Sequence, residues 1–159
     1  MREVSVKCVT VEPVTSRYLL ILETKDGFYY LPIHIGVLEA ETIFSHLNSL
    51  IPPRPMTFDF FSEIIRSVKD LSVTRVVIDD FEKGIYKAKV YLKNGGLEKW
   101  VDCRPSDAIA LATKIGASIF VNESILKDKK CISKDCLKSS EKELLEKIIT
   151  DNTTTFWNV

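Results

Sequence analysis

Hydrophobic and polar residues alternate over residues 4–11, a pattern that predicts a strand with one buried face. The next apolar run, YLLILET over residues 18–24, is almost continuous and predicts a strand covered on both faces. Asp26 and Gly27 favour a tight turn, after which FYYLPIHI over residues 28–35 predicts the returning strand of a hairpin. The chain therefore begins with three consecutive strands.

Helical spacing replaces the alternation after Gly36. A first helix is predicted by apolar residues spaced three and four apart, namely Ala40, Ile43, Phe44 and Leu47. The proline-rich residues 51–55 cannot lie inside a helix and predict a stiff connector. Thr57 is a favourable N-cap and Asp59 a favourable first-turn residue for a second helix. The buried stripe of that helix is expected at Phe61, Ile64, Ile65 and Val68.

The second half of the chain has the same order of elements. Its strands are predicted at residues 73–79, 85–93 and 97–103. Asn94 and Gly95 form the turn between the last two strands. A helix then opens at Pro105 and ends at Gly116, before a last short strand at residues 118–121.

Residues 68 positions apart correspond in the two halves, as Gly27 and Gly95 do in the two turns. The same offset pairs Tyr18 with Tyr86, Glu39 with Asp107, Ala40 with Ala108, Ile43 with Leu111 and Leu47 with Ile115. Two copies are too few for a solenoid. We therefore predict a single α+β domain, built from a duplicated strand-hairpin-helix unit, with a mixed or antiparallel sheet and helices packed on it.

The composition changes after Lys127, where the chain becomes rich in lysine. We expect residues 1–127 to form the domain and residues 128–159 to form a Lys-rich tail. The tail is expected to carry a short helix at residues 140–149 and to be peripheral or partly disordered.

The length of 159 residues suits one domain with its own core. The 22 basic and 22 acidic side chains give a formal net charge of zero. This balance excludes nucleic-acid binding through bulk positive charge but leaves room for a local patch. No apolar run is long enough to span a membrane, so we expect a soluble, cytoplasmic protein. Free thiols are expected at Cys8, Cys103, Cys131 and Cys136.

Polar residues gather at the beginnings of the predicted helices, in a sequence without a Walker loop or a GxGxxG, HExxH or GxSxG motif. They are Glu39, Arg54, Thr57, Asp59, Asp102, Arg104, Ser106 and Asp107. Carboxylate oxygens are the ligands that Mg²⁺ and Mn²⁺ prefer, and arginines hold phosphate oxygens bidentately. One interpretation is therefore a divalent-cation site for phosphodiester hydrolysis.

The same residues also have a purely structural interpretation. Ser106 is then an N-cap, and the acidic residues at 39, 59 and 107 are favourable first-turn charges. Arg104 pairs with Asp102 in this interpretation and ties a strand to a helix. His34 and His46 fit packing or surface roles better than that of a general base.

Aromatic residues recur in the predicted strands, at Tyr29, Tyr30, Tyr86, Tyr91 and Trp100. On an exposed sheet face they would form a base-stacking platform, but their alternation favours packing in a half-buried sheet. The basic cluster of the tail, at Lys127, Lys129, Lys130, Lys134 and Lys138, indicates a solvated segment or a contact to a nucleic-acid backbone.

Four segments, LPIHIGVLEAETI, PRPMTFDFF, DCRPSDAIALA and IFVNE, resemble the bifunctional nuclease domain family, whose plant and bacterial members are reported to act on DNA and RNA. The resemblance covers residues 1 to about 127. The matching residues are Gly36, Glu39, Ala40, Arg54, Pro55, Thr57, Asp59, Asp102, Arg104, Pro105, Ser106 and Asp107. Relatives often have His in place of Phe58 and Trp in place of His34. If that first His is a general base, this chain lacks it unless His34 substitutes.

The clusters and the resemblance together lead us to expect a metal-dependent nuclease acting on DNA, RNA or both. Mg²⁺ or Mn²⁺ is expected at Asp102, Asp107 and Glu39, with Asp59 as a further ligand. Phosphate is expected at Arg54 and Arg104, with Thr57 and Ser106 beside them. We also expect a homo-oligomer with nucleic acid as a partner. The alternative is a non-catalytic anion- or protein-binding regulatory module, in which the same residues cap and brace the fold.

Overall fold

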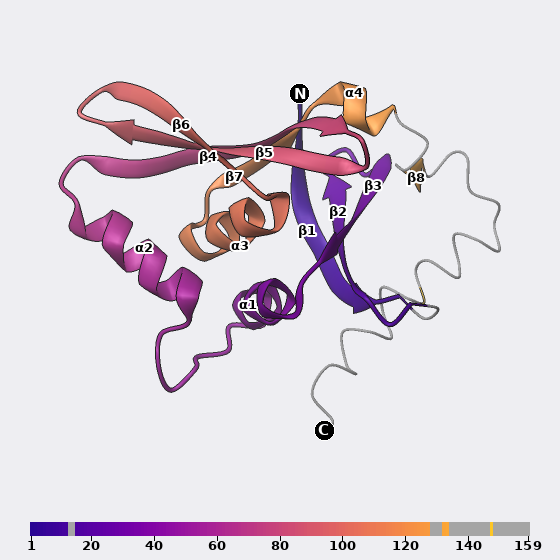
Figure 1. Ribbon diagram of the computed structural model, residues 1–159, viewed down its shortest axis with the longest axis horizontal. Coiled ribbons are helices and arrows are strands. Elements are labelled where there is room, and N and C mark those ends of the chain that lie inside the picture. The colour runs from indigo at the N-terminus through magenta and orange to yellow at the C-terminus, as the bar shows by residue number, and fades with distance from the viewer. Residues whose placement is uncertain (13–14, 128–131, 134–146, 148–159) are drawn as a thin grey trace.

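The computed structural model of the chain describes residues 1–12, 15–127, 132–133 and 147. In this part of the chain, eight strands form one mixed sheet, and helices α1, α2 and α3 lie together on one side of it (Figure 1). The fold is a single α+β domain, as the sequence predicts. No helix among the described residues is long and apolar enough to cross a membrane.

The first half contains three antiparallel strands and a helix, namely β1 (Arg2–Val11), β2 (Tyr18–Thr24), β3 (Tyr29–Ile35) and α1 (Val37–Leu47). Strand β2 is covered on both faces, because Leu20, Ile21 and Leu22 are all almost fully buried. Ile21 packs with Cys8 and Tyr30 in a small cluster of its own, while its two neighbours belong to the main core. The continuous apolar pattern of this strand is thereby explained.

The second half begins with α2 (Thr57–Ser67) and continues through β4 (Leu71–Glu82), β5 (Ile85–Asn94), β6 (Leu97–Cys103), α3 (Pro105–Ile115) and β7 (Ser118–Val121). Strands β4, β5 and β6 pair antiparallel in chain order, as β1, β2 and β3 do. Helix α3 ends at Gly116, whose φ of 81° is the left-handed conformation that glycine adopts without strain.

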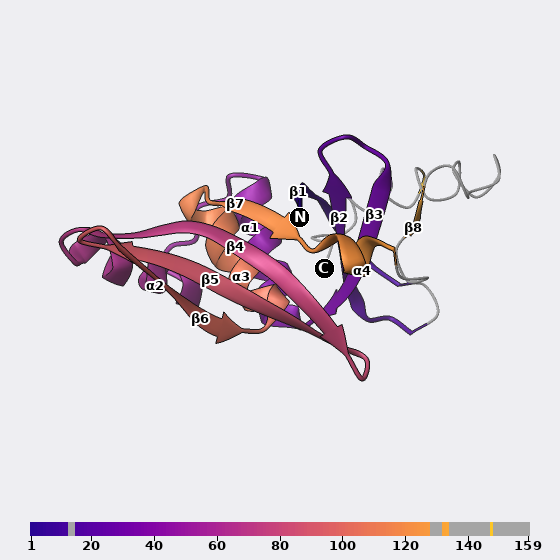
Figure 2. The same cartoon turned by 90° about the horizontal axis from the view of Figure 1, so that it is seen from above.

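Strand β7 joins the two groups of three strands into one sheet, with the order β6-β5-β4-β7-β1-β2-β3-β8. It pairs antiparallel with β1 and parallel with β4. Figure 2 shows the two groups on opposite sides of β7. Each group is followed in sequence by a helix that packs on the same side, so the arrangement accommodates a duplication, which itself stays a prediction.

The main core lies between the sheet and helices α1 and α3. Ala40 and Ala108, which correspond under the 68-residue offset, are both fully buried. Small side chains at these positions allow α1 and α3 to pack closely against each other and the sheet.

The structure differs from the sequence-based expectation at several boundaries. Strand β4 is longer than predicted at both ends. The N-cap of α2 is Met56, and Thr57 is its first residue. The N-cap of α3 is Arg104 and not Ser106, because Pro105 already occupies the first helical position. These shifts of one to three residues follow from backbone hydrogen bonds that a local sequence pattern alone does not fix.

Two short elements were not predicted, namely α4 (Glu123–Leu126) and β8 (Ile132–Ser133). Asn122 caps α4 by accepting a hydrogen bond from the Ser124 N–H at 3.3 Å. Strand β8 pairs with β3 and lies beyond the predicted domain boundary at residue 127. The predicted helix at residues 140–149 falls almost entirely outside the described residues.

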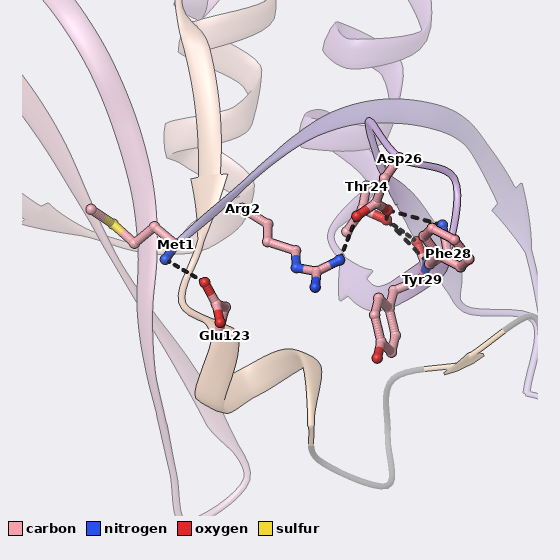
Figure 3. A network of polar contacts seen from close by, with 7 residues as sticks. All are labelled: Met1, Arg2, Thr24, Asp26, Phe28, Tyr29 and Glu123. Carbon is pink, nitrogen blue, oxygen red and sulfur yellow. Dashed lines mark hydrogen bonds and ion pairs between the residues drawn. The ribbon is translucent and has the colours of Figure 1, made fainter.

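Polar contacts join the N-terminal residues to the turn between β2 and β3 and to α4 (Figure 3). The Met1 ammonium lies 3.0 Å from the Glu123 carboxylate, and Arg2 pairs with Asp26. Asp26 also accepts hydrogen bonds from Thr24 Oγ1 at 2.6 Å and from the Phe28 N–H at 3.0 Å. The predicted Asp26-Gly27 turn is thus held by its own aspartate.

Among the described residues, Cys8 and Cys103 are free thiols, as predicted. Burial raises the pKa of each to about 11, so both remain protonated at neutral pH. Cys131 and Cys136 lie outside the described residues.

Candidate functional site

Arg104 stands at the junction of β6 and α3 and binds two carboxylates at once. Its Nε and Nη2 atoms donate to the two oxygens of Asp107 at 2.8 and 2.9 Å, in a bidentate pair. Its Nη2 also donates to Glu39 Oε1 at 2.7 Å. The Arg104 side chain is 70% exposed, whereas Glu39 is only 8% exposed. One exposed guanidinium is therefore shared by a partly buried and a buried carboxylate, and the three side chains keep one formal negative charge.

The two carboxylates occupy equivalent places in the fold. Glu39 is the third residue of α1, and Asp107 is the third residue of α3. In each helix this position lies beside unpaired backbone N–H groups that favour a negative charge. Because α1 and α3 pack side by side, their first turns meet at Arg104.

Gly36 makes room for the Glu39 carboxylate. A Cβ atom on Gly36 would lie closer to Glu39 Oε2 than any real Cβ contact allows. The φ of Gly36 is −79°, which any residue can adopt, so the requirement for glycine here comes from space and not from backbone conformation. Gly36 is the N-cap of α1, just as Arg104 is the N-cap of α3.

A cleft of about 590 Å³ opens beside Arg104. Its walls come from three segments: the end of β3 with Gly36, the turn between β4 and β5, and the first residues of α3. The polar side chains of the wall belong to His34, Arg104 and Ser106, and the apolar ones include Pro32, Ile85, Tyr86 and Pro105. His34 Nε2 lies 3.4 Å from the Glu12 carboxylate.

Asp59 belongs to a second polar cluster, at the other ends of the same two helices. Asp59 Oδ1 lies 3.3 Å from His46 Nε2 and forms an ion pair with Lys114. Asp59 Oδ2 accepts a hydrogen bond from the Met56 N–H at 2.8 Å. His46 lies near the end of α1 and Lys114 near the end of α3, so this cluster is about 10 Å from Glu39 along α1.

The pKa values of the second cluster reflect its burial. Burial raises the pKa of the Asp59 carboxyl, but hydrogen bonds from Lys114, Met56 and His46 outweigh it and hold the pKa below the ordinary 3.8. Burial also lowers the pKa of His46 below the ordinary 6.5, despite the opposing effect of Asp59. Asp59 is therefore ionised and His46 neutral at neutral pH. The buried Nδ1 of His46 has no hydrogen-bond partner among the described residues.

The remaining predicted site residues lie apart from these two clusters. Asp102 is exposed on β6, opposite Lys89 of β5, and Arg104 pairs with Asp107 and Glu39, not with Asp102 as the structural interpretation supposed. Arg54 and Thr57 are exposed at and just after the proline-rich connector. Within the described residues, no three His, Cys, Asp or Glu side chains come together in an arrangement that would hold a metal ion.

The aromatic residues divide between the core and an open sheet face. Tyr30 is buried, and Tyr86 packs against the core. Tyr91 and Trp100 lie opposite each other on β5 and β6, where Arg75 covers the Tyr91 ring at 3.9 Å and Lys89 covers the Trp100 ring at 4.6 Å. These cations are themselves paired with Glu98 and Asp79.

Sequence reasoning gave His46 no functional role and did not single out Lys114. A signal for both was present, because His46 and Lys114 are 68 positions apart, as are Glu39 and Asp107, and Gly36 and Arg104. Each polar cluster thus brings together residues at corresponding positions of the two halves.

Comparison with known proteins places both clusters within one family model, described as the bifunctional nuclease domain, which matches residues 20–134. Two proteins of Mycobacterium tuberculosis are similar to this chain: uncharacterized protein MT1877 of strain CDC 1551 / Oshkosh and uncharacterized protein Rv1829 of strain ATCC 25618 / H37Rv. Each is 34% identical over 126 residues, which cover 79% of this chain and 74% of the relative.

Proposed function

The chain belongs to the bifunctional nuclease domain family, and on that premise we propose that it hydrolyses nucleic-acid phosphodiesters in a metal-dependent reaction at the cleft beside Arg104. The observation that carries the proposal is the Arg104 guanidinium itself. It is exposed, it lines a cleft of about 590 Å³, and its partners are two carboxylates. A phosphodiester carries one negative charge shared by two non-bridging oxygens, which are spaced much like the oxygens of a carboxylate. The two N–H groups that now bind Asp107 can therefore bind a phosphodiester in the same bidentate way.

The donor set beside Arg104 suits Mg²⁺ or Mn²⁺. Mg²⁺ is commonly bound through one or two carboxylates together with waters and substrate phosphate oxygens, without an all-protein cage. Glu39 and Asp107 form such a pair, since a single nitrogen of Arg104 is within hydrogen-bond distance of both. Asp59 lies in the other cluster and Asp102 on the open face of β6, so we limit the proposed ligands to Glu39 and Asp107.

The chain's own residues then have distinct tasks. Arg104 releases one of its carboxylate partners and binds two phosphate oxygens of the substrate in its place. Ser106 supplies a hydroxyl to the same wall of the cleft. Glu39 and Asp107 would hold the ion, which would supply Lewis-acid polarisation of the phosphoryl group. The apolar side chains that line the cleft, which include Pro32, Ile85 and Pro105, would reduce the water around the phosphate and so strengthen these charge interactions.

Cleavage of labelled single-stranded RNA, single-stranded DNA and plasmid DNA tests the proposal. Purified protein should cut with Mg²⁺ or Mn²⁺ and stop with chelator, and Asp107→Asn should lower the rate about 100-fold, as loss of one group that stabilises the transition state does. Glu63→Gln, an exposed carboxylate of α2, is the control and should cut at the wild-type rate. Cutting that survives chelator, or that Asp107→Asn leaves unchanged, would contradict the proposal.

A non-catalytic anion- or protein-binding module is the second candidate, and one observation favours it. Two hydrogen bonds of Arg104 hold Asp107 in the first turn of α3, and a third reaches Glu39 and ties the β6–α3 junction to α1, as a structural brace does. If this is the whole role of the cluster, Arg104→Gln lowers the melting temperature while the wild-type protein cuts no substrate. Cleavage by the wild type that Arg104→Gln abolishes without loss of folded structure excludes this candidate.

A further inference from the structure

The cleft beside Arg104 is lined by side chains of two kinds. His34, Arg104 and Ser106 supply its polar groups, while Pro32, Ile85 and Tyr86 supply apolar surface. The Tyr86 ring packs against the Phe81 ring, with 4.4 Å between the ring centroids. Ile85 is 67% exposed at the start of β5, where an apolar side chain gains nothing from the protein's own core.

The volume of the cleft suits a ligand of one nucleotide. Sites for small molecules measure about 300 to 1,000 Å³ and combine apolar walls with a few polar groups that fix orientation. At about 590 Å³ the cleft falls in this range. A nucleotide matches this lining, because its base has an apolar face and its phosphate is an anionic group.

The charge of the chain argues against a broad contact with a duplex. Binding along a duplex backbone relies on several lysines and arginines that each neutralise a phosphate. Here the formal net charge is zero, and Arg104 is the one Lys or Arg side chain among the residues that line the cleft. On the open sheet face, the cations Arg75, Lys87 and Lys89 are all paired with carboxylates. We therefore expect the protein to bind nucleic acid through a few contacts at the cleft, and contacts to a base should contribute to the affinity.

We propose that the cleft takes one unpaired nucleotide of a single strand, with its phosphate on Arg104 and Ser106 and its base against Pro32, Ile85 and Tyr86. This inference rests on the proposed phosphodiester site at Arg104 and names its substrate class. A base inside a duplex is stacked and paired, and it must be extruded at a cost of a few kcal/mol before it can enter such a cleft. Single-stranded DNA or RNA does not bear this cost.

Binding of fluorescently labelled octamers in chelator, where no cutting is expected, tests the inference. Single-stranded octamers should bind at least tenfold more tightly than the same sequence as a duplex. DNA and RNA octamers are compared in separate arms, and the tighter one identifies the preferred sugar. A nucleoside monophosphate should displace the octamer at a lower concentration than ribose 5-phosphate does, because only the former carries a base.

Two matched variants locate the contact. Ile85→Ser should weaken single-strand binding about tenfold, since loss of apolar contact in a pocket is worth a factor of that order. Leu97→Ser is the control, because Leu97 is 70% exposed and also follows a hairpin turn, but it does not line the cleft. Leu97→Ser should bind as the wild type does.

Equal affinity for single strands and duplex, or equal binding by the Ile85→Ser and Leu97→Ser variants, overturns the inference. Either result leaves the proposed function standing if the protein cuts with Mg²⁺ or Mn²⁺. Selective single-strand binding through Ile85 without any cutting supports the inference and refutes the proposed hydrolysis. The two proposals therefore fail separately.

Discussion

At the scale of single residues, the site depends on the two contacts that position the Glu39 carboxylate at the first turn of α1, one with Arg104 and one with Gly36. The carboxylate is buried, accepts a hydrogen bond from Arg104, and occupies the space where a side chain on Gly36 would begin. Removing a partner from a buried polar group costs about 1–3 kcal/mol, so the contact between Gly36 and Glu39 is a sensitive point of the site.

Gly36→Ala should lower the free energy of unfolding by about 1–3 kcal/mol, because the new Cβ displaces the Glu39 carboxylate from Arg104. Urea denaturation measures the change. In a Glu39→Ala background the same substitution should cost less, since the clash with the carboxylate is gone and only the lower preference for alanine at an N-cap remains. Equal losses in both backgrounds would show that the contact between Gly36 and Glu39 is not the cause.

The burial of His46 predicts a pH dependence of stability. Its pKa is lowered below the ordinary 6.5 in the folded protein, so the unfolded chain binds more protons as the pH falls toward and below that value. The His46 contribution to the free energy of unfolding should therefore decrease as the pH falls from 7.5 to 5.5. Denaturation curves at several pH values measure it, and His46→Gln should reduce this slope. An unchanged slope in the variant would contradict the assignment to His46.

At the scale of elements, one carboxylate connects three helices. Asp59 accepts a hydrogen bond from the Met56 N–H at the N-terminus of α2. It also pairs with His46 of α1 and Lys114 of α3. The buried stripe predicted for α2 is wrong, because Phe61, Ile64 and Val68 are exposed and the buried residues of this helix are Asp59 and Ser62. The position of α2 therefore depends on Asp59 more than on apolar packing.

Asp59→Ala should lower the free energy of unfolding by about 3 kcal/mol, because it removes an N-terminal hydrogen bond and leaves Lys114 and His46 without their partner. Glu63→Ala on the same helix is the control and should cost less than about 1 kcal/mol, since its pair with Arg66 is solvent-exposed. Chemical denaturation compares the two variants. Similar losses would mean that Asp59 is not the connection.

At the scale of the whole molecule, the parallel pairing of β4 with β7 and the antiparallel pairing of β7 with β1 bring the two halves together. This topology places the first turns of α1 and α3 at one end and their last turns at the other. It also sets the turn between β4 and β5 beside the end of β3 and so forms the cleft. The expected homo-oligomer stays a prediction at this scale, and light scattering of the purified protein, with a mass above that of one chain, would confirm it.

The elements themselves were largely predictable from the sequence. Alternation, helical spacing and turn residues identified β1 to β7 and α1 to α3, because each of these signals acts over neighbouring residues. The short elements α4 and β8 were missed, since two to four residues carry little periodicity and β8 exists only through its pairing with β3. The motif residues also sufficed to identify the family.

The sequence by itself determined the strands, the helices, the family and the kinds of side chain available for chemistry. Only the tertiary structure decided which of these side chains meet. It divided the predicted carboxylates between two clusters, gave Arg104 the partners Glu39 and Asp107, and joined Asp59 to His46 and Lys114. The physical reason is that local patterns fix where a helix begins and ends, whereas contacts across 13 to 65 residues depend on how the strands are ordered in the sheet.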